Sequence, residues 1–222
     1  KIYVANLAEA NKELQELYDL EGSDKMQILK LLTRLRQLCL EPRLVYDNID
    51  QPSSKLKACM ELIKTMQENK QKVLLFSSFT SVLDLIAEEC QKAGITYYML
   101  TGSTNKEDRR ELVSRFQKDD TTVFLISLKA GGTGLNLTSA EAVIHFDPWW
   151  NVSAQNQATD RAYRIGQKNN VQVFNLVMKD SVEEKIIELQ KRKKELADMF
   201  VENNSGGLSQ MSKEDILSLF TM

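Results

Sequence analysis

The sequence contains few of the residues that build metal centres and disulfide frameworks. Its 222 residues include one histidine, His145, and three cysteines, Cys39, Cys59 and Cys90, which are far apart and form no CxxC pair. A single histidine excludes a cluster of several histidines, and scattered cysteines favour neither a zinc site nor a disulfide framework. We therefore expect no metal site in this chain, and we expect these four residues to be buried in the core.

Long apolar runs and an excess of one charge are also missing. No run approaches the roughly 18 residues of a membrane-spanning helix, and no charged and then apolar leader opens the chain. The formal net charge is only −2, so a nucleic-acid surface would have to be locally positive. We expect an intracellular protein without a membrane partner, in the bacterial cytoplasm at the nucleoid or in the eukaryotic nucleus. A first residue other than Met indicates a fragment or a processed piece.

Two nucleotide-binding signatures are absent as well. The chain contains neither the P-loop pattern GxxxxGK[ST] nor the dinucleotide pattern GxGxxG, and it has no adjacent Asp-Glu pair. In a nucleotide hydrolase the P-loop holds the β-phosphate, and the acidic pair holds Mg²⁺. If this chain takes part in ATP hydrolysis, the contacts to the β-phosphate and Mg²⁺ must come from residues outside it. The chain alone should not hydrolyse ATP.

Helical periodicity is present at both ends of the chain. In residues 1–45 the stronger apolar stripe consists of Ile28, Leu31, Leu32, Leu35 and Leu38. Asp24 with Gln27 has the pattern of a capping box, and Pro42 ends this helical segment. Ser181 with Glu184 has the same pattern and predicts a long helix near the carboxyl end. A Gly, Ser and Asn-rich link over 203–211 and a short helix over 212–220 follow.

Short apolar runs alternate with helical patterns through the middle of the chain. The runs lie at residues 72–77, 96–100, 122–127, 142–146 and 171–177. Between them, helices are predicted near 54–66, at 80–93 before Gly94, and from a Thr104 and Glu107 capping box to about Gln117. Strands buried on both faces are continuously apolar, and right-handed crossovers place helices on both faces. The pattern predicts an α/β fold with an open parallel sheet.

The segments that follow the predicted strands carry the chemistry. They are residues 101–104, 127–136 and 147–151, and ligands bind at the carboxyl ends of strands in such sheets. The loop KAGGTGLN at 129–136 is glycine-rich, so its backbone amides can approach a phosphate closely. Taken alone, the loop is more typical of an ordinary turn.

A pair of arginines follows the last of these segments. In a helix, Arg161, Arg164 and Gln157 project from one side. The planar guanidinium suits phosphate oxygens and stabilises negative charge that develops during phosphoryl transfer. An exposed helix with an ion pair from Asp160 to Arg164 explains the same spacing. Spacing alone favours the exposed helix with an ion pair.

Three sequence strings in this order favour a functional role for the glycine-rich loop and the arginine pair. SLKAGGTGLNL at 127–137, DPWWN at 147–151 and QATDRAYRIGQ at 157–167 closely resemble motifs of the Swi/Snf-type DNA-dependent ATPases of helicase superfamily two. Other upstream parts of the chain are similar to further segments of that family. They are VLLFSSF, LTGST with Arg109, and the strings LRQLC and PRL. The resemblance weakens after about residue 200. Val152 and the Leu-Glu before Pro42 depart from the family pattern.

The resemblance implies a fold and a division of the chain. Residues 53–180 would be the second of two RecA-like lobes, an open parallel sheet flanked by helices. Residues 1–52 would be a helical insertion, and 181–222 a docking helix, a flexible link and a short terminal helix. The missing N-terminal RecA-like lobe would hold ATP with Mg²⁺.

The resemblance also implies roles for individual residues. Arg161 and Arg164 would be the catalytic arginines. The residues lining ATP would be Gln157, Gly134 and Asn136. Contacts to the DNA backbone would come from Thr101, Gly102, Lys129, Gly131 and Trp149. For Lys129 a solvated position, and for Trp149 a packed one, are the structural alternatives.

These roles describe the second motor lobe of an ATP-dependent translocase or remodelling ATPase on double-stranded DNA. Its partners would be duplex DNA and the N-terminal lobe, with a DNA-bound protein as a further candidate substrate. Two alternatives stay open at this point. One is a non-catalytic module that binds DNA or protein, and the other is a lobe of a strand-separating helicase.

Overall fold

The chain forms two compact units in a computed structural model. The structure describes residues 2–19, 25–131, 135–149, 152–160, 162, 170–199 and 219–220. One unit is Leu56–Val177, and the other combines Lys1–Lys55 with Met178–Met222. The first and last segments of the chain thus belong to one unit, while the three-part division with boundaries after residues 52 and 180 stays a prediction.

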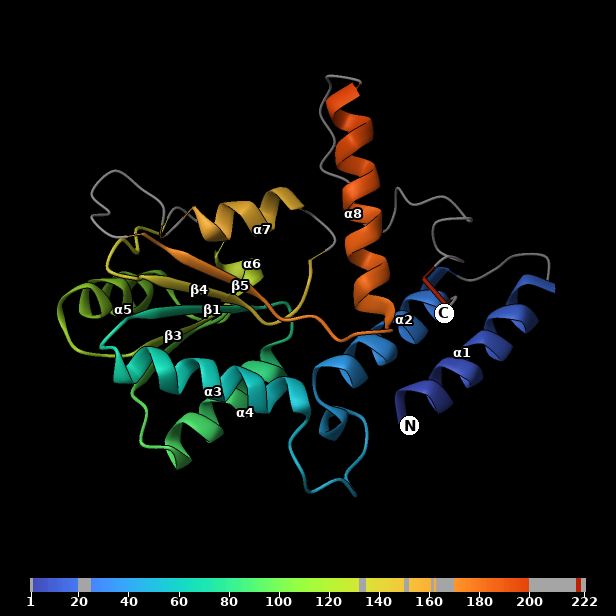
Figure 1. The fold of residues 1–222 in the computed structure, drawn as a ribbon, viewed down its shortest axis with the longest axis horizontal. Coiled ribbons are helices and arrows are strands. Elements are labelled where there is room, and N and C mark those ends of the chain that lie inside the picture. Colours follow the sequence, from blue (N-terminus) through green and yellow to red (C-terminus); the bar gives the residue numbers. More distant parts are fainter. Residues whose placement is uncertain are drawn as a thin grey trace. The chain divides into compact units, whose positions relative to one another are not determined.

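The central unit is built on a five-stranded sheet. Its strands are β1 (Val73–Ser77), β2 (Tyr97–Leu100), β3 (Val123–Ser127), β4 (Ala142–His145) and β5 (Gln172–Asn175). Their order is β2-β3-β1-β4-β5, and every neighbouring pair is parallel (Figure 1). At its first residue, Val73, β1 is in register with Val123 of β3 and Ala142 of β4. The predicted open parallel sheet is confirmed.

Burial across the sheet follows the sequence of each strand. The residues of β1, β3 and β4 are all buried, as expected for the continuously apolar runs VLLFS, VFLIS and AVIH. The two edge strands are less buried. In β2 only Leu100 is fully buried, and β5, which is shorter than predicted, is largely exposed, with Val173 at 42% exposure. A strand at the edge has only one neighbour and one row of paired backbone groups.

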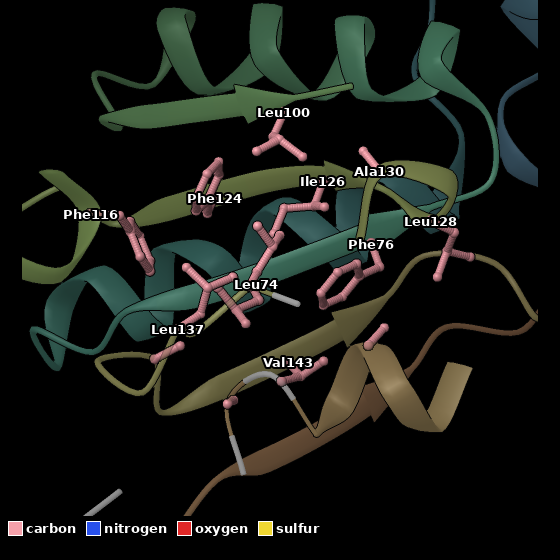
Figure 2. Close-up of a cluster of buried hydrophobic side chains, with 14 residues drawn as sticks. Leu74, Phe76, Leu100, Phe116, Phe124, Ile126, Leu128, Ala130, Leu137 and Val143 are labelled. Carbon is pink, nitrogen blue, oxygen red and sulfur yellow. The ribbon is translucent and has the colours of Figure 1, made fainter. Parts of the chain in front are cut away.

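Helices cover both faces of this sheet. α3 (Ser54–Glu68) and α4 (Thr80–Lys92) lie on one face (Figure 1). The other face carries α5 (Lys106–Lys118), the short α6 (Leu128–Gly131) and α7 (Val152–Thr159). Figure 2 shows the apolar cluster on that face, which includes Leu74, Phe76, Leu100, Phe116, Phe124, Ile126, Leu128, Ala130, Leu137 and Val143. This cluster sets the positions of α5, α6 and α7.

The start of α5 differs from the prediction by one residue. The N-cap is Asn105, whose side-chain oxygen accepts from the amides of Glu107 (3.0 Å) and Asp108 (2.9 Å). Thr104 was the predicted cap, but its hydroxyl oxygen accepts from the Thr101 amide instead (3.1 Å). The extended backbone of Asn105 brings its amide oxygen over the first turn, which makes asparagine the cap here.

The second unit is helical. Its elements are α1 (Ile2–Asp19), α2 (Lys25–Leu40), the 3-10 helix η1 (Pro42–Leu44) and α8 (Val182–Met199). They confirm the predicted helices before and after the sheet, and α2 ends just before Pro42 as expected. Asp24 and most of residues 212–220 lie outside the described residues. No helix in the described part of the chain is both long and apolar enough to cross a bilayer.

The predicted capping pair begins α8. The Ser181 hydroxyl accepts from the Glu183 amide (3.2 Å), and a Glu184 carboxylate oxygen accepts from the Asp180 amide (2.8 Å). These two bonds satisfy amides that have no partner within the helix. Both predicted residues therefore cap the start of α8, although the amides that they bind are those of Glu183 and Asp180 and not the Glu184 and Ser181 amides of a capping box.

Candidate functional site

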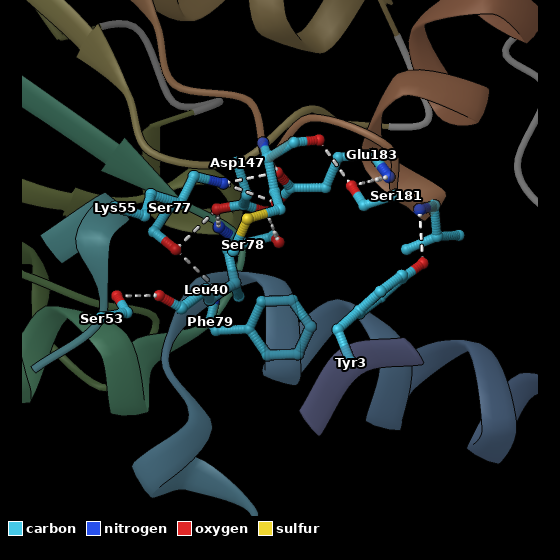
Figure 3. Close-up of polar contacts among 12 residues, drawn as sticks. Tyr3, Leu40, Ser53, Lys55, Ser77, Ser78, Phe79, Asp147, Ser181 and Glu183 are labelled. Carbon is cyan, nitrogen blue, oxygen red and sulfur yellow. Dashed lines mark hydrogen bonds and ion pairs between the residues drawn. The ribbon is translucent and has the colours of Figure 1, made fainter. Parts of the chain in front are cut away.

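A buried carboxylate fixes the carboxyl end of β4 to that of β1. Asp147 is only 1% exposed, and its Oδ1 accepts from the Ser77 hydroxyl (2.7 Å) and the Ser78 amide (3.0 Å). Its Oδ2 accepts from the Ser78 hydroxyl (Figure 3). Asp147 is the first residue of the DPWWN string, so this clamp sets where that turn begins. Sequence analysis missed the two serines, although two hydroxyls directly after an apolar strand were a visible signal.

Trp149, in the same turn, is half-buried and packs against the apolar cluster. Its backbone amide donates to the side-chain oxygen of Gln155 in α7 (3.2 Å), and the Gln155 amide nitrogen donates to Asn175 in β5 (3.0 Å). The turn is therefore linked to both the helix and the edge strand that follow it. The packed alternative for Trp149 agrees with this position, and its DNA contact stays a prediction.

His145 connects the last residue of β4 to the end of α7. The ring is buried and stacks on Phe76, with centroids 5.6 Å apart, and its Nε2 lies 2.9 Å from the Thr159 hydroxyl. The Thr159 hydroxyl also donates to the Gln155 carbonyl (3.3 Å). Burial lowers the pKa of His145 to about 4, although the nearby Asp147 carboxylate raises it. His145 is a neutral core residue, as predicted.

The end of α7 leads directly to the predicted arginines. The helix ends at Thr159, and the Ala162 amide donates back to the Thr159 carbonyl (3.1 Å). Ala162 is fully buried in the apolar cluster, which anchors the chain immediately after Arg161. Arg161 and Arg164 themselves lie outside the described residues. Their common helical face with Gln157 therefore stays a prediction.

Most other predicted site residues follow the carboxyl ends of strands. Gln157 is exposed on α7, and Lys129 is exposed on α6, where Gly131 is the last residue. In the turn after β2, Thr101 is half-buried and Gly102 is exposed. Gly134 lies outside the described residues.

Asn136 lies beside α5. The Gln117 side chain donates to the Asn136 carbonyl (2.7 Å) and accepts from the Ser139 amide (3.0 Å). Gln117 is in the last turn of α5, a helix that runs away from the carboxyl edge of the sheet. After α6 the chain therefore returns along α5, and Asn136 is exposed beside that helix.

A cavity of about 590 Å³ lies between α5 and this returning loop. Its lining residues are Thr104, Lys106, Arg109, Arg110, Val113, Leu135 and Asn136. Three of them are cationic and none is acidic, so the cavity suits an anion. Arg109 also donates to the Ala130 carbonyl (3.2 Å), which ties α6 to α5. Sequence analysis included Arg109 in a motif and missed Lys106 and Arg110.

Within the described ranges, no group of three or more His, Cys, Asp or Glu side chains is arranged to hold a metal ion. All three cysteines are buried free thiols, as predicted.

Comparison with known proteins shows similarity to one family. The sequence profile described as "Helicase conserved C-terminal domain" matches residues 54–166. An uncharacterized ATP-dependent helicase of Mycoplasma pneumoniae is 37% identical over 96% of this chain and 21% of its own length. The ISWI chromatin-remodeling complex ATPase ISW1 of Saccharomyces cerevisiae is 34% identical over 94% of this chain and 20% of its own length. The chain thus spans about a fifth of these relatives.

Two solved structures have the same fold over nearly the whole chain. The Sulfolobus solfataricus SWI2/SNF2 ATPase core in complex with dsDNA is 30% identical, with a TM-score of 0.78 over 98% of this chain and 47% of its own. The C-terminal domain of the Sulfolobus solfataricus SWI2/SNF2 ATPase is 26% identical, with a TM-score of 0.73 over 97% of this chain and 92% of its own.

Proposed function

Since the chain belongs to the family of helicase conserved C-terminal domains and is a RecA-like lobe of the Swi/Snf type, we propose that it is the second motor lobe of an ATP-dependent translocase or remodelling ATPase on double-stranded DNA. One observation carries this proposal. An ATPase core solved with dsDNA covers 98% of the chain with a TM-score of 0.78 and is 30% identical to it. A DNA substrate implies that the whole protein acts inside the cell.

ATP with Mg²⁺ is the cofactor in this proposal, and the N-terminal lobe holds the metal. Mg²⁺ neutralises charge on the β- and γ-phosphates when it is bound. In this chain, Arg161 and Arg164 stabilise the negative charge that develops on the transferred phosphoryl group. The link from His145 to Thr159 and the buried Ala162 support these arginines, because they anchor the chain just before and just after Arg161.

The residues that line the nucleotide in this proposal are Gln157, Gly134 and Asn136. Gln157 and Asn136 are exposed, so their amide groups are accessible to ribose or phosphate oxygens. Gln157 lies on α7 and Asn136 lies against α5, so we assign these two residues to different parts of the nucleotide. The chain supplies no P-loop and no Asp-Glu pair. The isolated lobe is therefore inactive in our proposal.

The DNA contacts in this proposal are to the backbone and do not read bases. They come from Thr101, Gly102, Lys129, Gly131 and Trp149. Lys129 is exposed on α6, and a side chain added at Gly102 would meet no protein atom within 4 Å. Phosphate contacts fix position along the duplex without selecting sequence, which suits a protein that moves along DNA.

The proposal is tested with the isolated chain and with the same chain joined to its N-terminal lobe. We expect the isolated chain to hydrolyse no ATP, and the two-lobed protein to hydrolyse ATP faster when duplex DNA is added. Displacement of a DNA-bound roadblock without strand separation would distinguish a translocase from a strand-separating helicase. ATP hydrolysis by the isolated chain, or a two-lobed ATPase that does not respond to DNA, would contradict the proposal.

Gly102 offers a selective test of the DNA contacts. Because the space around it is open, Gly102→Val should leave the fold stable. A DNA backbone that approaches Gly102 closely would meet the added side chain, so we expect weaker duplex binding. Unchanged binding would exclude Gly102 from the DNA interface.

A further inference from the structure

Helix α5 carries three of its five positive charges on one stripe, and no acidic residue lies in that stripe. With about 100° of rotation per residue, Lys106, Arg109, Arg110 and Val113 form one stripe, and this is the stripe that lines the cavity. The three acidic residues of the helix, Glu107, Asp108 and Glu111, lie roughly 100° to 200° away from Lys106. The stripe that lines the cavity therefore contains three cations and no acidic residue, whereas the helix as a whole has five cations and three acidic residues.

The acidic residues of α5 also have other partners. Asp108 accepts from the Asn105 side chain (2.7 Å), and Glu111 forms an ion pair with Arg115. By contrast, no hydrogen bond or ion pair to another described residue engages the side chain of Lys106 or Arg110. Both of these cations are exposed. They are available for a ligand, whereas Arg109 is already bonded to the Ala130 carbonyl.

The cavity has the form of a site for a phosphate joined to a sugar. Val113 and the buried Leu135 contribute apolar surface, and Thr104 contributes a hydroxyl group. The Thr104 oxygen accepts from the Thr101 amide, so its own hydroxyl hydrogen can be donated to a ligand. Gln117 holds the loop of Asn136 against α5 with two hydrogen bonds, which keeps the wall of the cavity in place.

We propose that this cavity is a phosphodiester site, in which Lys106 and Arg110 bind the DNA backbone in addition to the contacts made by Thr101 and Gly102. The inference rests on the proposed function, because it takes duplex DNA as the ligand. A chain with a net charge of −2 needs a local concentration of positive charge to bind DNA, and this stripe supplies one. The Thr104 to Thr101 hydrogen bond joins the cavity to the loop that carries Gly102.

The test measures duplex DNA binding by the two-lobed protein over a range of salt concentrations. Each phosphate contact contributes about 0.9 to the slope of log K against log salt. Lys106→Ala and Arg110→Ala should each reduce the slope by about 1 and weaken binding about three- to tenfold at 0.15 M salt. Arg110→Lys keeps the charge and should retain most of the slope.

Lys118→Ala is the matched control. Lys118 is an exposed cation on the same helix, but it lies roughly 120° away from the stripe. Its removal should leave the slope within about 0.3 of the wild-type value. An equal loss in Lys118→Ala and Arg110→Ala would show that only total charge matters, and it would overturn the proposal.

Other outcomes separate the proposal from its rivals. A Lys106→Ala/Arg110→Ala protein with wild-type DNA affinity and slope would overturn it. A double variant that binds DNA normally but has a changed KM for ATP, or a changed inhibition by inorganic pyrophosphate, would also overturn it. In either case the cavity would bind a free phosphate compound and not DNA. If the wild-type two-lobed protein did not bind duplex DNA at all, the proposed function would fail first, and this proposal with it.

Discussion

Lys55 Nζ lies 2.6 Å from Oε1 and 2.7 Å from Oε2 of Glu183, and the two side chains are 5% and 1% exposed (Figure 3). Glu183 Oε2 also accepts from the Met178 amide (2.7 Å). The pair joins the first turn of α3 to the first turn of α8, at a sequence separation of 128 residues. A buried carboxylate with both oxygens satisfied depends on its partner, because its alternative is an uncompensated charge.

Removing one member of this pair should therefore destabilise the chain. We expect Lys55→Met to lower the free energy of unfolding by about 3–5 kcal/mol, and Lys55→Met/Glu183→Leu to recover most of the loss. Urea denaturation followed by circular dichroism measures both. Lys92→Met is the control, because Lys92 pairs with Glu89 (2.8 Å) on the surface and should lose less than about 1 kcal/mol. A similar small loss in Lys55→Met would contradict this account of the pair.

His145 should make stability depend on pH. Its pKa is lowered from the usual 6.5 to about 4 in the folded chain, so between these values the unfolded chain binds the extra proton. Stability is therefore complete above pH 6.5 and falls as the pH decreases towards 4. At pH 5.5 the loss through this group is about 1.4 kcal/mol relative to pH 8. His145→Gln should reduce the pH dependence of unfolding by this amount, and an unchanged dependence would refute the assignment.

The cysteines should be unreactive in the native chain. Burial raises the pKa of the Cys39 and Cys90 thiols to about 12, and Cys59 is buried as well. The thiolate is the reactive form, and at pH 8 only about one buried thiol in 10⁴ is ionised. We expect no rapid reaction with Ellman's reagent in buffer and reaction of three thiols per chain after unfolding in guanidinium. Rapid native labelling would show that these sites are open.

Asp147 should contribute more to stability than an exposed aspartate. Asp147→Ala leaves the Ser77 hydroxyl and the Ser78 amide without their acceptor, and we expect a loss of about 2–5 kcal/mol. Asp147→Asn keeps one acceptor oxygen and should lose less. Asp84→Ala, at an exposed position of α4, is the control and should change stability by less than about 0.5 kcal/mol. Equal losses at Asp84 and Asp147 would contradict the clamp.

The sequence predicted the sheet because its buried strands have an unambiguous pattern. The runs that became β1, β3 and β4 are continuously apolar, and such runs form strands with neighbours on both sides. β5 was found in the right place, but its exposure was not predicted. Whether a strand lies at the edge depends on the order of the strands in the sheet. The pattern of apolar residues along the chain does not predict that order.

The candidate site was predicted less completely, because part of it depends on contacts between distant segments. Thr104 and Asn105 are both good helix caps, and only the backbone conformation selects Asn105. The i,i+4 spacing of Lys106 and Arg110 was visible in the sequence. Their position opposite Asn136 was not, since it depends on hydrogen bonds from Gln117 to a loop about 20 residues away.

The central claim is that this chain supplies the arginine that completes an ATPase site. The most direct measurement is the rate of DNA-stimulated ATP hydrolysis by the two-lobed protein carrying Arg161→Ala. Since such an arginine is worth about 10³ to 10⁵ in rate in other phosphoryl-transfer enzymes, we predict near-complete loss of turnover with an unchanged circular dichroism spectrum. Arg115→Ala, at an exposed arginine paired with Glu111, should keep the wild-type rate. Turnover close to wild type in Arg161→Ala would contradict the account.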